Sequence, residues 1–292
     1  QSKQNLKTDN LMSKFELFYQ SDLLLSGAVS FNQDNDALVC CLDGNILSIS
    51  DEGKASVWCE TGGSPQSVTF DETGKAYICD QASKSICTFS DETGVIRMAD
   101  HYEERPFNGP NSTAIDSEGT IYFTDSGAYG ECSFARPSGS LFYIGSQDRI
   151  LQPLLESCIA HPSGICVSGS GAEAVVYVAE TCSNRILKGT QYPQGVFQFS
   201  VFYQFSGGMG PTGMDIDDDG NLYVARQDFG HSSATGCVTK LSSRGKVLAE
   251  VDTPAPHITG LSIGPKTSST PYLYVTEVET KSVYRIALGD IE

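Results

Sequence analysis

Three of the four histidines in this 292-residue chain stand where they could act as general bases. An imidazole changes charge near neutral pH, so it can take a proton from water or from a hydroxyl group. His161 and His257 each stand two residues before the start of a repeated strand pattern, and His231 lies in a loop rich in glycine and serine. The sequence therefore predicts His257, His161 and His231 as candidate catalytic residues, with an ordinary hydrogen-bonded role as the alternative for each.

The repeated pattern consists of a strand, a polar turn and a second strand, as in NSTAIDSEGTIYFTDSG at 111–127. Aligning six copies on the residue that opens the first strand gives Gly27, Gln66, Asn111, Ser163, Thr212 and Thr259, with gaps of 39, 45, 52, 49 and 47 residues. Hairpins at this spacing, without a helical period, indicate a propeller built from four-stranded blades. We therefore predict an all-β fold, a six-bladed β-propeller.

The last repeat supplies only SVYRIAL (282–288) after its hairpin, so it lacks an outer strand. The segment FELFYQ (15–20) is predicted to fill that place, because the pairing would close the ring and remove a free sheet edge. The expected organisation is an N-terminal tail over residues 1–14 and one propeller domain over residues 15–292. The closing element is thus an N-terminal strand.

In a four-stranded blade, the start of the first strand and the end of the second lie on one face. The loops 127–139 and 227–236 lie on this same face and form a rim around the central opening. The polar residues at or near these positions are predicted to bind a ligand there: Asn111, Thr212, Ser163, Thr259, Gln66 and Arg226.

Charged residues end the second strand of every hairpin: Asp43, Asp80, Asp125, Glu180, Arg226 and Glu277. A catalytic carboxylate occurs at one place, so an acid repeated around the ring predicts a structural role, accepting hydrogen bonds from backbone amides. Arg226 is the exception. It could pair with an acid of an adjacent blade or with an anionic group of a ligand.

The fifth repeat also contains Asp215, Asp217, Asp219 and Gly220, which match the start of an EF-hand calcium loop. The twelfth position of that loop requires a bidentate glutamate, and here it is Arg226. The segment also coincides with the strand-turn-strand pattern of the other repeats. The sequence therefore predicts a hairpin here and not a calcium loop.

The composition limits the class of partner. The formal net charge is −17, from 19 Lys and Arg against 36 Asp and Glu, which argues against nucleic acid or an anionic membrane. No run of 18 apolar residues is present, so no membrane span is expected. Most of the ten cysteines fall in predicted strands and none forms a CxxC pair, which predicts a reduced, cytoplasmic protein.

Several segments resemble a known family. NGPNSTAIDSEGTIYFTDSG (108–127), GPTGMDIDDDGNLYVA (210–225) and GLSIGPKTSSTPYLYVTE (260–277) resemble the senescence marker protein, gluconolactonase and luciferin-regenerating-enzyme group. HPSGICVSGSGAEAVVYVAETCSNRIL (161–187) is similar to strictosidine synthase-like proteins. The resemblance implies a six-bladed propeller with a divalent cation in its central tunnel, held by a Glu, two Asn and an Asp.

Transferred position by position, the resemblance leaves one of these four ligands in place. The third-blade Asn matches Asn111, but the fourth-blade Asn falls on Ser163, the fifth-blade Asp on Thr212, and the first-blade Glu on Ser26 or Gly27. Calcium takes six to eight oxygen ligands, usually with carboxylates among them. The sequence therefore leaves open whether a calcium ion binds through Asn111, and it does not identify a cofactor.

Two functions follow from these observations. The first is a small-molecule-binding propeller that resembles lactone and ester hydrolases, in which Asn111 and Thr212 orient a ligand carbonyl and one histidine acts as base. The alternative is a non-catalytic propeller that serves as a platform for a protein partner.

Overall fold

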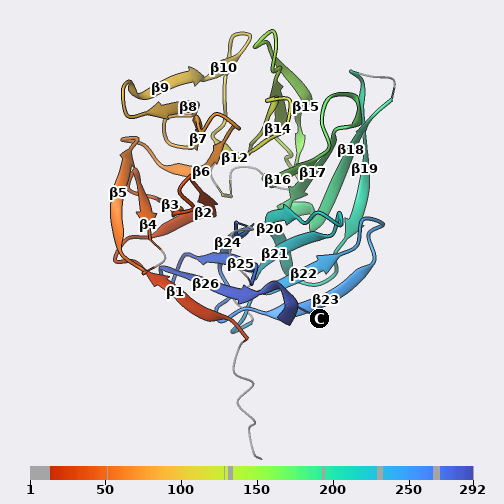
Figure 1. Ribbon diagram of the computed structural model, residues 1–292. Coiled ribbons are helices and arrows are strands. Elements are labelled where there is room, and N and C mark those ends of the chain that lie inside the picture. Colours follow the sequence, from red (N-terminus) through yellow and green to blue (C-terminus); the bar gives the residue numbers. More distant parts are fainter. Residues whose placement is uncertain are drawn as a thin grey trace, which may run out of the picture.

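The computed structural model describes residues 14–50, 52–127, 129–130, 134–192, 195–228, 233–265 and 270–291. Six four-stranded antiparallel sheets stand around a common centre, and the described part of the chain has no α-helix (Figure 1). The predicted six-bladed β-propeller is confirmed. No helix within the described ranges is long and apolar enough to cross a membrane.

The first five blades run from an inner strand outward in chain order, and the sixth takes its outer strand from the N-terminal segment. The first blade is β2 (Leu25–Phe31), β3 (Ala37–Cys41), β4 (Asn45–Ile49) and β5 (Ala55–Glu60). The second is β6 (Pro65–Phe70), β7 (Ala76–Asp80), β8 (Ser85–Ser90) and β9 (Gly94–Ala99). The third is β12 (Pro110–Ile115), β13 (Ile121–Asp125), β14 (Gly139–Ile144) and β15 (Leu151–Ile159).

The remaining blades follow the same plan. The fourth is β16 (Pro162–Ser168), β17 (Val175–Glu180), β18 (Arg185–Gln191) and β19 (Phe197–Gln204). The fifth is β20 (Met209–Ile216), β21 (Leu222–Asp228), β22 (Cys237–Leu241) and β23 (Val247–Asp252). The sixth is β24 (Ile258–Ile263), β25 (Tyr272–Glu277), β26 (Ser282–Ala287) and β1 (Glu16–Gln20).

Five short elements of the described chain lie outside the blade sheets. They are the ribbon of β10 (His101–Tyr102) and β11 (Arg105–Pro106) between the second and third blades, and three 3₁₀ turns at Gly171–Glu173, Thr181–Ser183 and Leu288–Asp290. Sequence reasoning did not predict the ribbon.

The N-terminal strand β1 closes the ring by pairing antiparallel with β26 (Figure 1). Glu16 lies opposite Arg285, and their side chains form an ion pair at 2.5 Å. Phe15, just before the strand, is 7% exposed and packs into the core of the last two blades. The predicted closure is confirmed, while the predicted tail lies outside the described residues apart from Lys14.

The hydrophobic core is divided into six clusters, one between each pair of neighbouring blades. Between the first and second blades, for example, Leu38 and Cys40 pack against Val68 and Ile78. The nine described cysteines are free thiols, and most of them are buried among apolar side chains. They therefore serve as small core residues.

Hydroxyl groups on the strands near the axis join each of the first five blades to the next. Ser26 is buried, and its Oγ donates a hydrogen bond of 2.6 Å to the carbonyl oxygen of Pro65 in the second blade. The same kind of bond runs from Thr69 to the carbonyl of Thr113 (3.2 Å), from Thr124 to Ser163 (2.7 Å), from Ser163 to Thr212 (3.1 Å) and from Thr212 to Ile258 (2.8 Å). Side chains near the axis thus fix the blades relative to one another.

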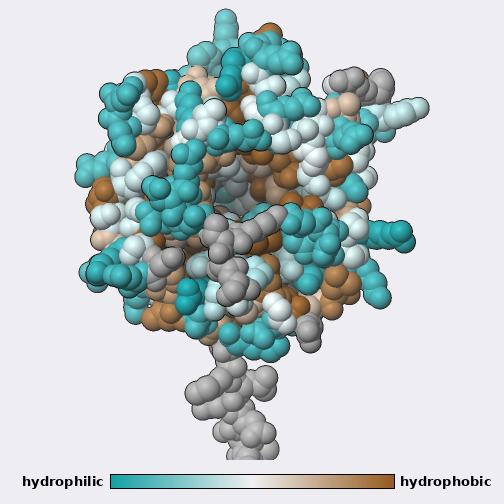
Figure 2. All heavy atoms as spheres, viewed as in Figure 1, coloured by the Kyte–Doolittle hydropathy of each residue, from teal (hydrophilic) through white to brown (hydrophobic). Residues whose placement is uncertain are grey.

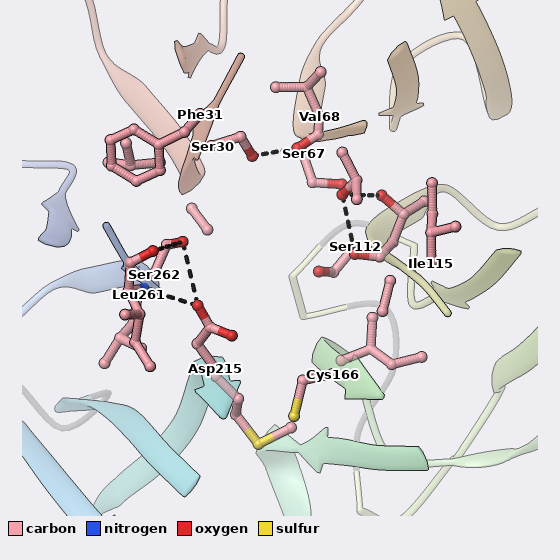
Figure 3. A pocket seen from close by; sticks show the side chains of 18 of the residues that line it. Ser30, Phe31, Ser67, Val68, Ser112, Ile115, Cys166, Asp215, Leu261 and Ser262 are labelled. Atoms are coloured by element: carbon pink, nitrogen blue, oxygen red, sulfur yellow. Dashed lines mark hydrogen bonds between the residues drawn. The ribbon is translucent and has the colours of Figure 1, made fainter. Parts of the chain in front are cut away.

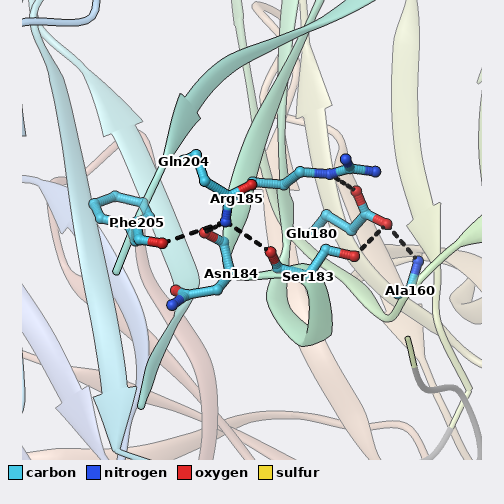
Figure 4. A network of polar contacts seen from close by, with 7 residues as sticks. All are labelled: Ala160, Glu180, Ser183, Asn184, Arg185, Gln204 and Phe205. Carbon is cyan, nitrogen blue, oxygen red and sulfur yellow. Dashed lines mark hydrogen bonds and ion pairs between the residues drawn. The ribbon is translucent and has the colours of Figure 1, made fainter. Parts of the chain in front are cut away.

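The acids that end the second strands also have a structural role, as predicted. Both oxygens of Asp125 accept backbone amide hydrogen bonds, from Asn108 at 2.9 Å and Gly109 at 2.7 Å. Figure 4 shows the corresponding contacts of Glu180, which accepts from the amide of Ala160 at 2.9 Å and pairs with Arg185. Asp125 and Glu180 therefore hold the segments that lead into the first strands of their own blades. Asp43 differs, because it accepts from the amide of Asn45 at 3.2 Å, at the start of the third strand.

Replacing Ser26 by alanine is expected to destabilise the protein by about 1–2 kcal/mol, because the carbonyl of Pro65 loses its buried donor. The matched control is Ser56→Ala on the exposed outer strand β5, where a change within about 0.5 kcal/mol is expected. Urea unfolding of the two variants measures the difference. Equal stabilities would show that the hydroxyl does not join the blades.

Candidate functional site

A cavity of about 260 Å³ lies where the six inner strands begin. All six positions aligned from the sequence line it: Gly27, Gln66, Asn111, Ser163, Thr212 and Thr259. Tyr129, His161, Thr181 and Gln227 complete its wall. We call this space the ring cavity. The structure thus brings five of the predicted ligand-binding residues and one predicted histidine to one place.

Irregular pairing at the start of every blade shapes this ring. In each of the six inner hairpins the register shifts beside the aligned position, for example between Pro110 and Thr113 and between Pro211 and Met214. A bulge inserts an extra residue on one strand and redirects the side chains next to it. The shifts therefore explain how successive residues near the axis turn toward the cavity while the rest of each strand keeps its alternation.

Two of the ring hydroxyls are already engaged in the blade contacts. Ser163 Oγ lies 3.1 Å from the carbonyl of Thr212 and 2.7 Å from the hydroxyl of Thr181. Thr212 Oγ1 donates to the carbonyl of Ile258 at 2.8 Å. A hydroxyl has one proton to donate. The expected role of Thr212 as a donor to a ligand carbonyl therefore does not fit its observed hydrogen bond.

Asn111 differs from these neighbours. It opens the inner strand of the third blade and is only half-buried. Its carboxamide makes no hydrogen bond with any residue in the described part of the chain. A carboxamide has two N–H donors and one acceptor oxygen, so Asn111 presents both kinds of group to the cavity.

His161 is the predicted histidine that lines the ring cavity. It is 6% exposed, and its ring packs edge-on against Tyr129 with the centroids 5.3 Å apart. Burial lowers the pKa of His161 to about 4, so the imidazole is neutral at pH 7. Its backbone has a φ of +58°, a left-handed conformation that is costly for a side chain of this size.

The other predicted residues lie elsewhere. His257 is buried but does not line the ring cavity, and its Nδ1 lies 3.1 Å from the carboxylate of Glu279. Arg226 pairs with Glu250 of its own blade at 3.2 Å and stacks over the ring of Phe205 at 4.5 Å. His231 falls outside the described residues.

The sequence predicted Tyr129 and Gln227 only as members of the rim loops 127–139 and 227–236, and it did not predict Thr181. Thr181 and Gln227 directly follow Glu180 and Arg226, the charged residues that end the second strands. Adding the residue that follows the end of each second strand to the predicted face would have identified Thr181 and Gln227 individually. Tyr129 comes from the loop between β13 and β14, where no strand period applies.

The described lining of the ring cavity is electrically neutral. It contains an imidazole, amides and hydroxyls but no carboxylate. Across the described ranges of the chain, no group of three or more His, Cys, Asp or Glu side chains is arranged to hold a metal ion. The described lining therefore offers hydrogen bonds to a polar molecule.

Comparison with curated proteins finds lactonases. Lactonase drp35 of Staphylococcus haemolyticus is 27% identical over 218 residues, and the match covers 70% of this chain and 63% of the relative. Lactonase drp35 of Staphylococcus aureus strain USA300 is 28% identical over 224 residues with the same coverage. The matched part of the chain therefore spans less than two thirds of these relatives.

Solved structures share the fold. A gluconolactonase from Xanthomonas campestris superposes with a TM-score of 0.76 at 18% identity, over 93% of this chain and 88% of that one. Regucalcin from Agrobacterium tumefaciens, a calcium-binding protein, gives 0.75 at 18% identity over 92% of each chain. The sequence profile of the SMP-30/Gluconolactonase/LRE-like region matches residues 27–279. The chain therefore belongs to the SMP-30/gluconolactonase/LRE-like family.

Proposed function

We propose that the ring cavity binds a small uncharged lactone or ester, with Asn111 as the anchor for its carbonyl group. The observation that carries the proposal is the free carboxamide of Asn111 in a cavity it shares with the neutral His161. The volume of about 260 Å³ lies just below the usual range of about 300–1,000 Å³ for small-molecule sites, so the ligand is small.

His161 supplies the acceptor in this proposal. Its neutral ring carries one lone pair at pH 7, which can accept a hydrogen bond from a water molecule or from a ligand hydroxyl. Hydrolysis would consist of attack by that water on the carbonyl carbon while the imidazole takes the proton. The tetrahedral intermediate would then break its bond to the alkoxy oxygen, and the imidazolium would return the proton to that departing oxygen to give the hydroxy acid or the acid and alcohol. A pKa near 4 makes His161 a weak base, so we expect slow turnover.

The residues at the positions that hold a cation in the family do not fit a cation here. Ser163 and Thr212 use their hydroxyl protons to join blades. At the first-blade position stand Ser26 and Gly27, neither of which carries a carboxylate, and the Ser26 hydroxyl already binds the carbonyl of Pro65. A ring of neutral donors lacks the charge that Ca²⁺ requires. The proposed function therefore uses no metal step.

Replacing Asn111 by alanine is expected to weaken binding of a small lactone such as δ-valerolactone at least about tenfold, because the hydrogen-bond donor to the lactone carbonyl is lost. Binding is measured by ligand-observed NMR and turnover by titration of released acid. The native protein should behave identically with and without EDTA. A lactone affinity unchanged by Asn111→Ala, or a rate abolished by EDTA, would contradict the proposal.

The matched control is Asn108→Ala, which changes the same side chain three residues away. The carboxamide of Asn108 binds the carbonyl of Ser138 and does not line the ring cavity. Lactone affinity should be unchanged in this variant. Any loss shared by both variants would be attributed to a general effect on the third blade.

The engaged hydroxyls of Ser163 and Thr212 favour a second candidate, a non-catalytic propeller that acts as an interaction platform. At these two ring positions the hydroxyl protons are used to join neighbouring blades, so they cannot also be donated to a substrate. The same experiment decides between the candidates. A native protein that neither binds nor hydrolyses lactones or aryl esters would favour the platform.

A further inference from the structure

A second cavity, of about 410 Å³, lies farther along the axis of the propeller. Its wall consists of inner-strand residues beyond the aligned ring positions, from all six blades. Figure 2 shows the molecule hollowed at the centre of the ring, and Figure 3 shows the side chains around this space. We call it the axial cavity. None of the residues proposed above to bind a lactone lines it.

Among the described residues that line the axial cavity, Asp215 is the only one with a charged side chain. One carboxylate oxygen accepts from the amide of Ile263 at 2.8 Å and from the hydroxyl of Ser262 at 3.4 Å, both in the next blade. The other oxygen accepts from the amide of Ile216 at 2.8 Å. All three donors are neutral. Within the described ranges Asp215 has no ion-pair partner.

The position of Asp215 is specific to the fifth blade. Its neighbour Asp217 binds the turn residue Asn221 and the hydroxyl of Tyr223, as Asp116 does with Thr120 and Tyr122 in the third blade. Asp217 is therefore an ordinary turn residue. Asp215 stands two residues earlier, where the corresponding residues of the second and third blades are Thr69 and Ala114.

Burial raises the pKa of Asp215, and the hydrogen bonds from Ile263, Ile216 and Ser262 oppose that shift. Two backbone amides require an acceptor, which favours the ionised carboxylate. A carboxylate that lacks a counter-charge in a confined space is costly, and a cation placed beside it offsets the cost. The net charge of −17 adds a long-range attraction for cations.

The rest of the wall selects the kind of cation. Met214 and Cys166, which both carry sulfur, line the cavity together with Asp215. Apolar side chains such as Phe31 and Ile115 also face the cavity (Figure 3). Aromatic and sulfur groups suit a cation that carries an apolar part. A single carboxylate does not provide the oxygen ligands that Ca²⁺ or Mg²⁺ needs.

From this arrangement we infer that the axial cavity binds a small organic ammonium ion, with the ammonium group on Asp215 and the alkyl part against Phe31, Met214 and Cys166. The ammonium N–H groups donate to the carboxylate, whose lone pairs are only partly used by Ile263, Ser262 and Ile216. This site is separate from the proposed lactone site.

The test compares n-butylammonium chloride with 1-butanol, which has the same alkyl chain and no charge, by calorimetry and ligand-observed NMR. The native protein is expected to bind butylammonium at least about tenfold more tightly than butanol. In Asp215→Asn this preference should disappear. Equal affinity of the native protein for the two probes, or a preference that persists in Asp215→Asn, would overturn the inference.

Two further variants keep the test decisive if Asp215→Asn does not fold. Cys166→Phe fills the axial cavity without changing the charge, and it should weaken the binding of both butylammonium and butanol. Asn111→Ala alters only the ring cavity, and it should leave butylammonium binding unchanged while affecting lactone binding. A loss of butylammonium binding in Asn111→Ala with none in Cys166→Phe would place the ammonium ion in the ring cavity and overturn the inference.

Discussion

Replacing Gly27 by alanine is expected to destabilise the propeller by more than about 4 kcal/mol, a large part of the usual total of about 5–15 kcal/mol. A Cβ atom at this position would lie 1.4 Å from the carbonyl oxygen of Gln66, which is part of the backbone of the second blade. The glycine also has a φ of +59°, where an L-residue is strained. Either the blades separate or the hairpin changes its path.

The control for this prediction is Gly62→Ala. Gly62 has a φ of +71°, but a Cβ added there meets nothing within 4 Å, so only the backbone strain of about 1–2 kcal/mol remains. Thermal unfolding followed by circular dichroism measures both variants. Two similar losses would show that strain alone accounts for Gly27, and that the contact between the first and second blades is not tight.

Most of the fold follows from local sequence patterns. The strand-turn-strand unit recurs six times with strands of similar length, because each hairpin buries the same alternate positions between neighbouring blades. The closing strand was predictable because the last repeat is one strand short. The ribbon β10–β11 was not, since two paired residues on each side leave no periodic pattern.

The sequence predicted which residues line the candidate site better than it predicted what their side chains bind. Aligning the repeats placed Gln66, Asn111, Ser163, Thr212 and Thr259 in one ring, because equivalent positions of a propeller meet at its axis. The sequence could not show which hydroxyls bind a neighbouring blade, since those bonds join residues about 40–50 positions apart, the spacing of the repeats. It also could not separate His161 from His257, which occupy the same place in their repeats but differ in what surrounds them.

Acidification is expected to destabilise the native protein through His161. The pKa of this imidazole is about 4 in the folded protein and about 6.5 when it is exposed in the unfolded chain. Between these values the unfolded state binds the proton and the folded state does not, so stability rises with pH in this window. The lost stability reaches roughly 3 kcal/mol as the pH falls from about 7 to about 4, at about 1.4 kcal/mol per unit.

Carboxylates also titrate in this range, so the effect of His161 is read as a difference between the native protein and His161→Asn. Asparagine tolerates the positive φ at this position and has no titratable group. As the pH falls to about 4, we expect the native protein to lose roughly 3 kcal/mol of unfolding free energy relative to His161→Asn. An NMR titration of the His161 ring measures its pKa independently. A constant difference, or a ring that titrates near 6.5, would mean that His161 is charged in the folded protein at mildly acidic pH and is not the neutral acceptor that the proposed site requires.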